Sequence, residues 1–193
     1  MKSLAVLACA LAAGNAVATL DIPDGNPLGV SSTINVSGLG TISTLSLTLN
    51  ISGGNNGDLY AYLSYDGTLV TLLDRPGTAL LDNPVGFTDA GYSVTVEDGY
   101  SSLNDATGGS PVTGIYSATS GTFSEFTGDS TGPWTLFIAD MSGGDGSDSQ
   151  LDSWFLDING TTVPEPVTGA LLVFGAGALS IIVGRRLCQK RTA

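Results

Sequence analysis

The sequence predicts an all-β fold, an antiparallel β-sandwich over residues 19–162. Two observations predict it: short segments alternate polar and apolar residues between turn-forming residues, and no segment in this range has helical periodicity. About seven to nine strands at this spacing are typical of a sandwich. A third observation concerns the two ends, where apolar runs predict an N-terminal signal helix and one C-terminal transmembrane helix.

The first clear strand is predicted at residues 41–50, after an irregular leader at 19–32 that contains two prolines. Its alternation places Leu45, Leu47 and Leu49 on one face, with the isoleucine at position 42 out of step by one residue. This pattern predicts a strand that is buried on one face only.

A hairpin follows, in which residues 58–65 and 68–73 are the strands and Asp66-Gly67 is the turn. Further strands are predicted at 92–97, 121–126, 134–140 and 151–158, and a long loop at 98–114. We expect Trp154, Leu156 and Ile158 to share one face of the last strand. We also expect Tyr60, Tyr62 and Trp134 to fill the core between the sheets.

The charge distribution excludes several functions. The chain has 193 residues, 18 acidic, 6 basic and no histidine, for a net charge of -12. Residues 19–162 hold one basic residue, Arg75, against 17 acidic ones, a net charge of -16. Nucleic-acid binding needs clustered cations, which this segment lacks. Without histidine, there is neither an imidazole base nor a histidine ligand for a metal.

The N-terminal segment 1–18 is predicted to be a secretory signal peptide. A lysine precedes an apolar run, and Ala16-Val17-Ala18 has the small residues of a signal peptidase site, so we expect cleavage after Ala18. The alternative is a buried N-terminal helix. Both cysteines lie in the end segments, so the central domain has no disulfide.

The C-terminal segment 163–193 has three parts. Val163, Pro164, Glu165 and Pro166 come first; the prolines keep this stretch extended, and Glu165 supplies a charge. Residues 167–184 carry no charge and would span about 27 Å as a helix, enough for a bilayer core. The tail 185–193 contains a basic cluster that we expect to stay cytoplasmic: Arg185, Arg186, Lys190 and Arg191.

A Pro-Glu-Pro motif, an apolar span and Arg-Arg, in this order at the C-terminus, resemble a PEP-CTERM sorting signal. The resemblance implies transient anchoring in the inner membrane, processing by an exosortase, and a final location at the cell surface or outside the cell. Signal peptidase and exosortase would then be processing partners. The alternative is an ordinary single-span anchor.

The central domain resembles the proprotein convertase P domain, also called P/Homo B. The resemblance rests on Gly57-Asp58-Leu59, Phe126-Thr127-Gly128, Gly132-Pro133-Trp134-Thr135-Leu136, Asp140 and Leu151-Asp152-Ser153-Trp154, across residues 30–160. It implies a jelly-roll sandwich that accompanies a subtilisin-like protease without being the catalyst. A Ser-His-Asp triad is impossible in a chain without histidine.

The loop at 140–152 holds the candidate metal ligands Asp140, Asp145, Asp148 and Asp152. Flexible glycine-rich loops with several carboxylates can bind Ca²⁺, and Asp58 would add a ligand if the sandwich brings it close. The EF-hand spacing is missing, and we favour a solvated acidic loop over a calcium site. No cofactor is certain, and Ca²⁺ is the one candidate.

We therefore expect an exported, non-catalytic binding or structural protein, with extracellular polysaccharide or another exported protein as its partner and the membrane contacted through 167–184. The alternative is an accessory P-like domain that assists an exported protease or another enzyme. A glycan-degrading enzyme is a third reading, because with this many acidic residues a pair at catalytic distance arises by chance.

Overall fold

The computed structural model describes residues 10–13, 19–144 and 148–161. In this part the chain forms two β-sheets with three single-turn 3-10 helices, so the all-β prediction is confirmed. The strands are β1 (Ala10–Ala13), β2 (Leu20–Ile22), β3 (Val30–Val36), β4 (Thr41–Gly53), β5 (Leu59–Tyr65), β6 (Thr68–Asp74), β7 (Tyr92–Val96), β8 (Val112–Tyr116), β9 (Gly132–Asp140) and β10 (Ser149–Thr161). The 3-10 helices are η1 (Asn56–Asp58), η2 (Leu103–Asp105) and η3 (Phe123–Glu125).

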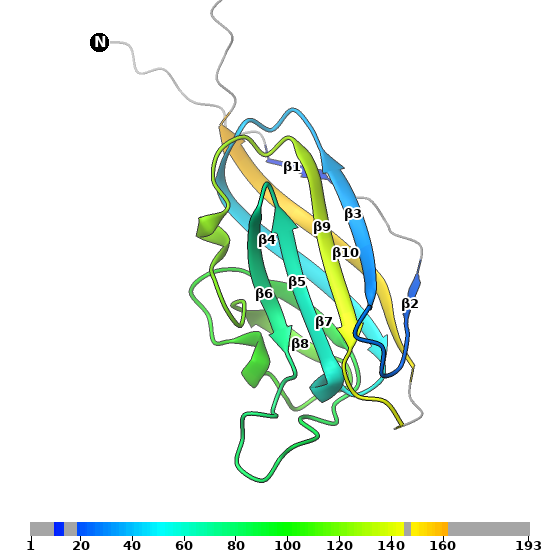
Figure 1. Ribbon diagram of the computed structural model, residues 1–193. Helices are drawn as coiled ribbons and strands as arrows, with labels where there is room; N and C mark the ends of the chain where they lie inside the picture. The colour runs from blue at the N-terminus through cyan, green and yellow to red at the C-terminus, as the bar shows by residue number, and fades with distance from the viewer. Residues whose placement is uncertain (1–9, 14–18, 145–147, 162–193) are drawn as a thin grey trace, which may run out of the picture. The chain divides into compact units, whose positions relative to one another are not determined.

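The two sheets pack face to face (Figure 1). Sheet A has the order β1-β10-β4-β7-β8, with β2 also paired to β10, and sheet B has the order β3-β9-β5-β6. All pairs are antiparallel except β7 and β8, which run parallel with Tyr92 opposite Val112. The prediction of a purely antiparallel sandwich is wrong at this pair, because the long loop after β7 returns the chain to the start of that strand before β8 begins.

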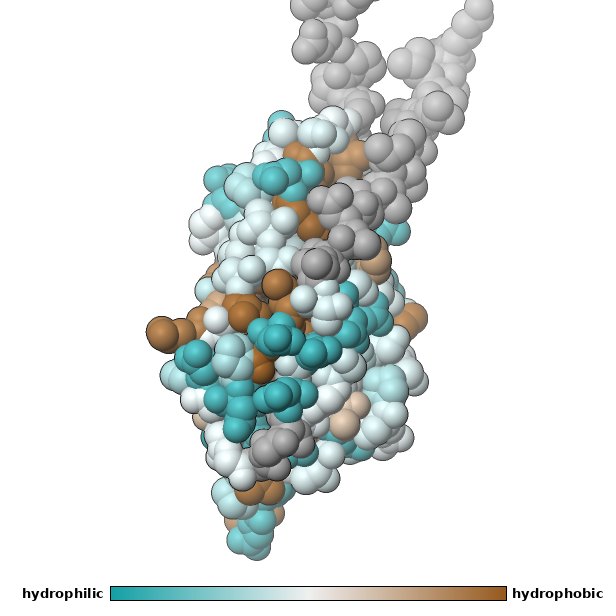
Figure 2. All heavy atoms as spheres, turned by 90° about the vertical axis from the view of Figure 1, so that its right-hand side faces the viewer, coloured by the Kyte–Doolittle hydropathy of each residue, from teal (hydrophilic) through white to brown (hydrophobic). Residues whose placement is uncertain are grey.

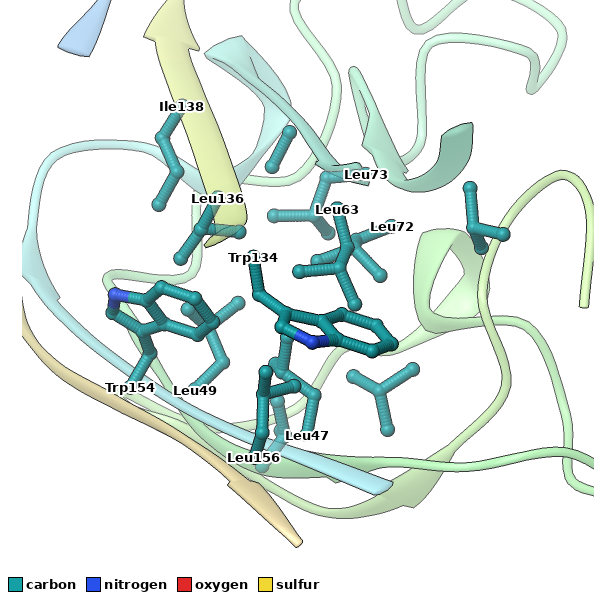
Figure 3. Close-up of a cluster of buried hydrophobic side chains, with 14 of the residues drawn as sticks. Leu47, Leu49, Leu63, Leu72, Leu73, Trp134, Leu136, Ile138, Trp154 and Leu156 are labelled. Atoms are coloured by element: carbon teal, nitrogen blue, oxygen red, sulfur yellow. The ribbon is translucent and has the colours of Figure 1, made fainter. Parts of the chain in front are cut away.

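The core lies between the sheets and follows from the alternation of each strand. Trp134 from β9 and Trp154 from β10 are both fully buried and lie among leucines of β4, β5 and β6 (Figure 3). Trp154, Leu156 and Ile158 share the inward face of β10, as predicted. The ring of Tyr65 stacks on Trp134 with centroids 4.0 Å apart. Aromatic pairs of this kind add to the stability that area burial alone provides.

Tyr60 and Tyr62 do not fill the core, so this prediction is wrong. Strand β5 buries Leu59, Ala61 and Leu63, and the period of two turns both tyrosines to the outer face of sheet B. The stretch Leu-Tyr-Ala-Tyr-Leu is apolar on both faces, so its sequence does not say which face lies inward.

The predicted irregularity at the start of β4 is confirmed. Ile42 lies opposite Gly160 and Thr44 opposite Asn159, so Ser43 is an extra residue in the β4 strand. Such a bulge shifts the alternation by one residue, which explains why Ile42 is out of step with Leu45, Leu47 and Leu49.

The strand predicted at 121–126 is wrong: this segment forms η3 instead. The carboxylate of Asp98 accepts hydrogen bonds from the backbone N–H groups of Phe123 (2.8 Å) and Ser124 (2.9 Å), and Glu125 Oε1 accepts one from the N–H of Thr122 (2.8 Å). These side chains satisfy backbone donors that a strand would have paired. The long loop predicted at 98–114 likewise contains η2 and the beginning of β8.

Within the predicted signal peptide, Ala10–Ala13 form β1 rather than a helix. This strand pairs antiparallel with β10, from Ala10 opposite Asn159 to Ala13 opposite Leu156. The pairing supplies backbone partners to an edge of sheet A that β2 covers only at Ser149–Leu151. Residues 1–9 and 14–18 lie outside the described residues.

No helix of the described residues is long and apolar enough to cross a membrane. The transmembrane helix predicted at 167–184 lies outside them.

Candidate functional site

The residues predicted for sorting and cleavage lie outside the described part of the chain. They are Ala16, Ala18, Val163, Pro164, Glu165, Pro166, Arg185, Arg186, Lys190 and Arg191. Their predicted roles in cleavage and sorting therefore stay predictions.

The predicted acidic loop is split between two environments. Asp140 ends β9 in sheet B and is fully buried, whereas Asp148 is exposed and Asp152 belongs to β10 in sheet A. Asp152 accepts a hydrogen bond from the Ser52 hydroxyl at 3.0 Å. The described residues contain no group of three or more carboxylates or thiols that could hold a metal ion. Asp145 lies outside the described residues.

Asp140 instead closes the end of the sandwich where β5 begins. Its Oδ1 accepts hydrogen bonds from the backbone N–H groups of Ser142 (3.0 Å) and Gly25 (3.4 Å). Its Oδ2 is buried and has no hydrogen-bond partner in the described residues. Burial raises the pKa of the Asp140 carboxyl, and the charges of Asp58 and Asp24 raise it further. Ionisation of Asp140 is therefore less favourable in this corner than in water.

Arg75 provides the positive charge nearest this corner. One nitrogen of its guanidinium, Nη2, lies 3.8 Å from Oδ1 of the buried Asp58. The backbone N–H of Met141 donates to the Asp58 carbonyl at 2.7 Å, which ties the chain after β9 to the start of β5. The geometry therefore accounts for Asp58 and Asp140 as residues that join two strand ends.

The best-formed hollow of the described domain is a groove of about 390 Å³ where sheet A is incompletely paired. Strand β7 pairs with β4 only from Leu47 onward, and on that side of β4 the next backbone contact is the N–H of Ile42 to the Gly128 carbonyl (2.8 Å). The groove occupies the interval between these two contacts. The residues that line it are Ile42, Ser43, Thr44, Leu45, Glu97, Asp98, Phe123, Ser124, Phe126 and Thr127.

The groove combines an apolar floor with a polar wall. Leu45, Phe123 and Phe126 are buried side chains of the floor, and the two phenyl rings lie 6.1 Å apart. Asp98 is fixed by the two backbone N–H groups of η3, whereas the carboxylate of Glu97 has no partner among the described residues. A volume of this size with a few polar groups over an apolar floor is typical of small-molecule sites.

A second hollow of about 380 Å³ lies beside Asp152 on the other half of β4. Here the hydroxyl of Tyr92 is buried without a partner in the described residues, and burial raises its pKa well above the usual range. The polar side chains at its wall bond to each other, as Ser93 Oγ does to Asn50 Oδ1 at 2.9 Å. This hollow therefore has one unpartnered hydroxyl, whereas the Glu97 groove has an unpartnered carboxylate.

The aromatic residues of the outer face of sheet B pack against each other. The rings of Tyr62 and Phe137 are stacked with centroids 4.8 Å apart, and Tyr60 meets Tyr62 edge to face at 6.2 Å. All three are half-buried. The side of the molecule seen in Figure 2 likewise carries its hydrophobic residues in small groups among hydrophilic ones.

The groove was missed in the sequence because its walls come from three separate segments. Glu97 ends a predicted strand and Asp98 follows it, which is a weak signal, while Phe123 and Phe126 lie in a segment predicted to be a strand. The bulge at Ser43 could have pointed to an interruption of β4, since bulges often mark functional edges.

The sequence matches no protein-family model, and no curated protein matches it. Among solved structures, a chain in the crystal structure of the Aeromonas sobria serine protease in complex with the chaperone ORF2 is similar, at 17% sequence identity and a TM-score of 0.44. The match covers 74% of this chain and 25% of that chain, so this protein spans about a quarter of its neighbour. A likeness of this size assigns no family, activity or partner.

Proposed function

We propose that this protein is an exported, non-catalytic binding or structural module of the cell surface or extracellular matrix. The observation that carries the proposal is the Glu97 groove on a sandwich that completes its own core from its own strands. The Glu97 carboxylate has no partner among the described residues and lies over an apolar floor, so the groove can offer it to a ligand. We also propose that the sandwich has the jelly-roll topology.

The export part of the proposal rests on the sequence of the two ends. Signal peptidase would remove residues 1–18, and residues 167–184 would hold the protein in the inner membrane until an exosortase acts near Val163–Pro166. After processing, the sandwich would stay at the surface or enter the matrix.

The second candidate is an accessory domain that assists an exported protease. Support comes from the residues that carry the P-domain resemblance, because each has a definite place in the sandwich. Gly57 and Asp58 end η1, Leu59 begins β5 opposite Asp140, and Trp134 and Trp154 fill the core. Copurification of this protein with an exported protease would favour this function.

Mass spectrometry of the protein from the producing cells tests the main proposal. We expect an N-terminus near Thr19 and a C-terminus at or near Val163–Pro166, with the full C-terminal segment retained when the exosortase gene is deleted. A protein that begins at Met1, or that has the same C-terminus in both strains, would contradict export or sorting respectively.

A further inference from the structure

The Glu97 groove is poorly suited to a negatively charged ligand. Its two ionisable side chains, Glu97 and Asp98, are both acidic. Arg75 is the one Lys or Arg side chain of the described residues, and it lies against Asp58 at the start of β5. An anion entering the groove would therefore meet two carboxylates and no compensating cation.

The polar wall of the groove consists mainly of hydroxyl groups. Ser43, Thr44, Ser124 and Thr127 line it together with the two carboxylates. The Thr44 hydroxyl accepts a hydrogen bond from Asn159 Nδ2 at 3.0 Å and keeps its own proton available for an acceptor. The Ser43 hydroxyl already donates to the Asn159 carbonyl at 2.7 Å, and the Ser124 hydroxyl is bonded to that of Thr122 at 2.8 Å. The wall therefore offers a ligand the Thr44 proton as a donor and the Glu97 carboxylate as an acceptor.

The floor of the groove is apolar, in contrast to its polar wall. Leu45, Phe123 and Phe126 present carbon atoms to the groove while remaining almost completely buried. A ligand that fits both surfaces has an apolar face and a rim of hydroxyl groups. A sugar ring has these properties, because its C–H groups form apolar faces while its hydroxyls project outward around the ring.

We propose that the Glu97 groove binds an uncharged sugar unit of a polysaccharide, with Glu97 accepting hydrogen bonds from two of its hydroxyls. This inference rests on the proposed binding function and names its ligand class. A peptide bearing a lysine is the competing occupant, and it fits less well because an ammonium group only donates and leaves the Thr44 proton without an acceptor. The groove lies at an interruption of sheet A, where β4 is not paired with β7 before Leu47.

The test is calorimetric titration of the protein purified from the producing cells. The probes are cellotetraose, maltotetraose and chitotetraose as uncharged sugars, tetragalacturonate as the anionic counterpart, and tetralysine as the peptide. We expect at least one uncharged sugar to bind, tetragalacturonate to bind at least about tenfold more weakly, and Glu97→Gln to weaken sugar binding about tenfold or more. Ser124→Ala is a second groove variant in case Glu97→Gln fails to fold.

Asp82→Asn is the matched control, because it makes the same chemical change at an exposed residue of the loop after β6 and Asn tolerates its positive φ of 63°. It should bind sugar as the unchanged protein does. Absence of binding to every uncharged sugar, equal binding by the groove variants, or binding of tetralysine alone would each overturn the inference. Failure of sugar binding in a protein that is exported and processed contradicts only the ligand, whereas an unprocessed intracellular protein contradicts the proposed function.

Discussion

Asp140 shows how burial changes the behaviour of a single carboxyl group. In the folded protein its pKa is raised above 3.8 by desolvation first, and by the charges of Asp58 and Asp24 in addition. The folded state therefore binds a proton more tightly than the unfolded chain. This group contributes stability at low pH, and that contribution is lost as pH rises from about 3.8 through the raised folded-state pKa.

We predict that Asp140→Asn makes the free energy of unfolding less dependent on pH above 3.8. Asn keeps the acceptor for the N–H groups of Ser142 and Gly25 but cannot ionise. Urea unfolding at pH 4, 5, 6 and 7 measures this, and the difference in stability between variant and unchanged protein should shift in favour of the variant as pH rises. Asp157→Asn, which removes an exposed carboxylate of β10, controls for net charge.

The same measurements decide whether calcium contributes. A metal bound at Asp140 would reverse the sign, because a cation stabilises the ionised carboxylate and Asp140→Asn would then destabilise the protein at neutral pH. Since the described carboxylates form no metal group, we expect the melting temperature to be the same in calcium and in EDTA. A lower melting temperature in EDTA would restore the calcium hypothesis for the loop that contains Asp145.

At the scale of elements, the start of β5 depends on a glycine that lets two backbones cross. The Gly57 N–H donates to the Phe87 carbonyl at 2.8 Å, and a Cβ at Gly57 would lie 2.5 Å from the Val85 carbonyl oxygen and 2.7 Å from Gly86 Cα. Both neighbours are backbone atoms that a rotamer change cannot move away. The glycine of the Gly-Asp-Leu motif is thus explained by the loop after β6, which packs across this position.

We predict that Gly57→Ala destabilises the fold by about 1–3 kcal/mol, the usual cost of overpacking. Gly67→Ala is the matched control: its φ is +79°, yet nothing lies within 4 Å of the added carbon, so only backbone strain of about 1 kcal/mol is expected. Denaturant midpoints of the two variants give the comparison. Equal loss in both would mean that the loop moves aside from Gly57 at little cost.

The sequence predicted well those elements in which polar and apolar residues alternate so regularly that only one face of the strand can be the buried one. Strand β4 carries leucine at every second position between Ser and Thr, and the Asp66-Gly67 turn has positive φ at both residues, as its hairpin requires. The 121–126 segment was mispredicted because the side chain that organises it, Asp98, lies over twenty residues away. Local periodicity contains no information about such a partner.

The candidate site was harder to predict than the strands for the same reason. The acidic loop suggested a metal site, but Asp140 and Asp152 belong to different sheets and point into different surroundings. The groove needs the bulge at Ser43, the end of β7 and the position of η3 all at once. None of these follows from residue composition. The motifs that carry the P-domain resemblance do not include Glu97, whose carboxylate has no partner among the described residues.

At the scale of the whole molecule, the charges separate a strongly acidic domain from basic ends. Of the six basic residues, Arg75 alone lies between residues 19 and 162. In the proposed function, the ends would interact with membranes and the sandwich with a ligand. This division predicts that the two functions can be separated by truncation.

We predict that deleting Pro164–Ala193 releases the protein from the membrane fraction and leaves the sandwich folded. The deleted segment contains the uncharged run and the basic tail, whereas the core residues all precede it. Fractionation of cells followed by thermal unfolding of the released protein measures both effects. Replacing Arg185 and Arg186 by lysine is the control, since it keeps the positive charge. Unchanged membrane association after the deletion would refute the anchor.

The position of β10 has a consequence for how the chain reaches its destination. Strand β10 is the last described strand, yet it lies inside sheet A between β4 and the N-terminal strands, just as β9 lies between β3 and β5. In a polypeptide that passes through a translocon N-terminus first, β4 and β5 have only β7 and β6 to pair with, and β3 has no partner strand, until residues 132–161 have emerged. Closing loops this long delays assembly. For an exported chain, completion of both sheets would therefore wait for the last two strands.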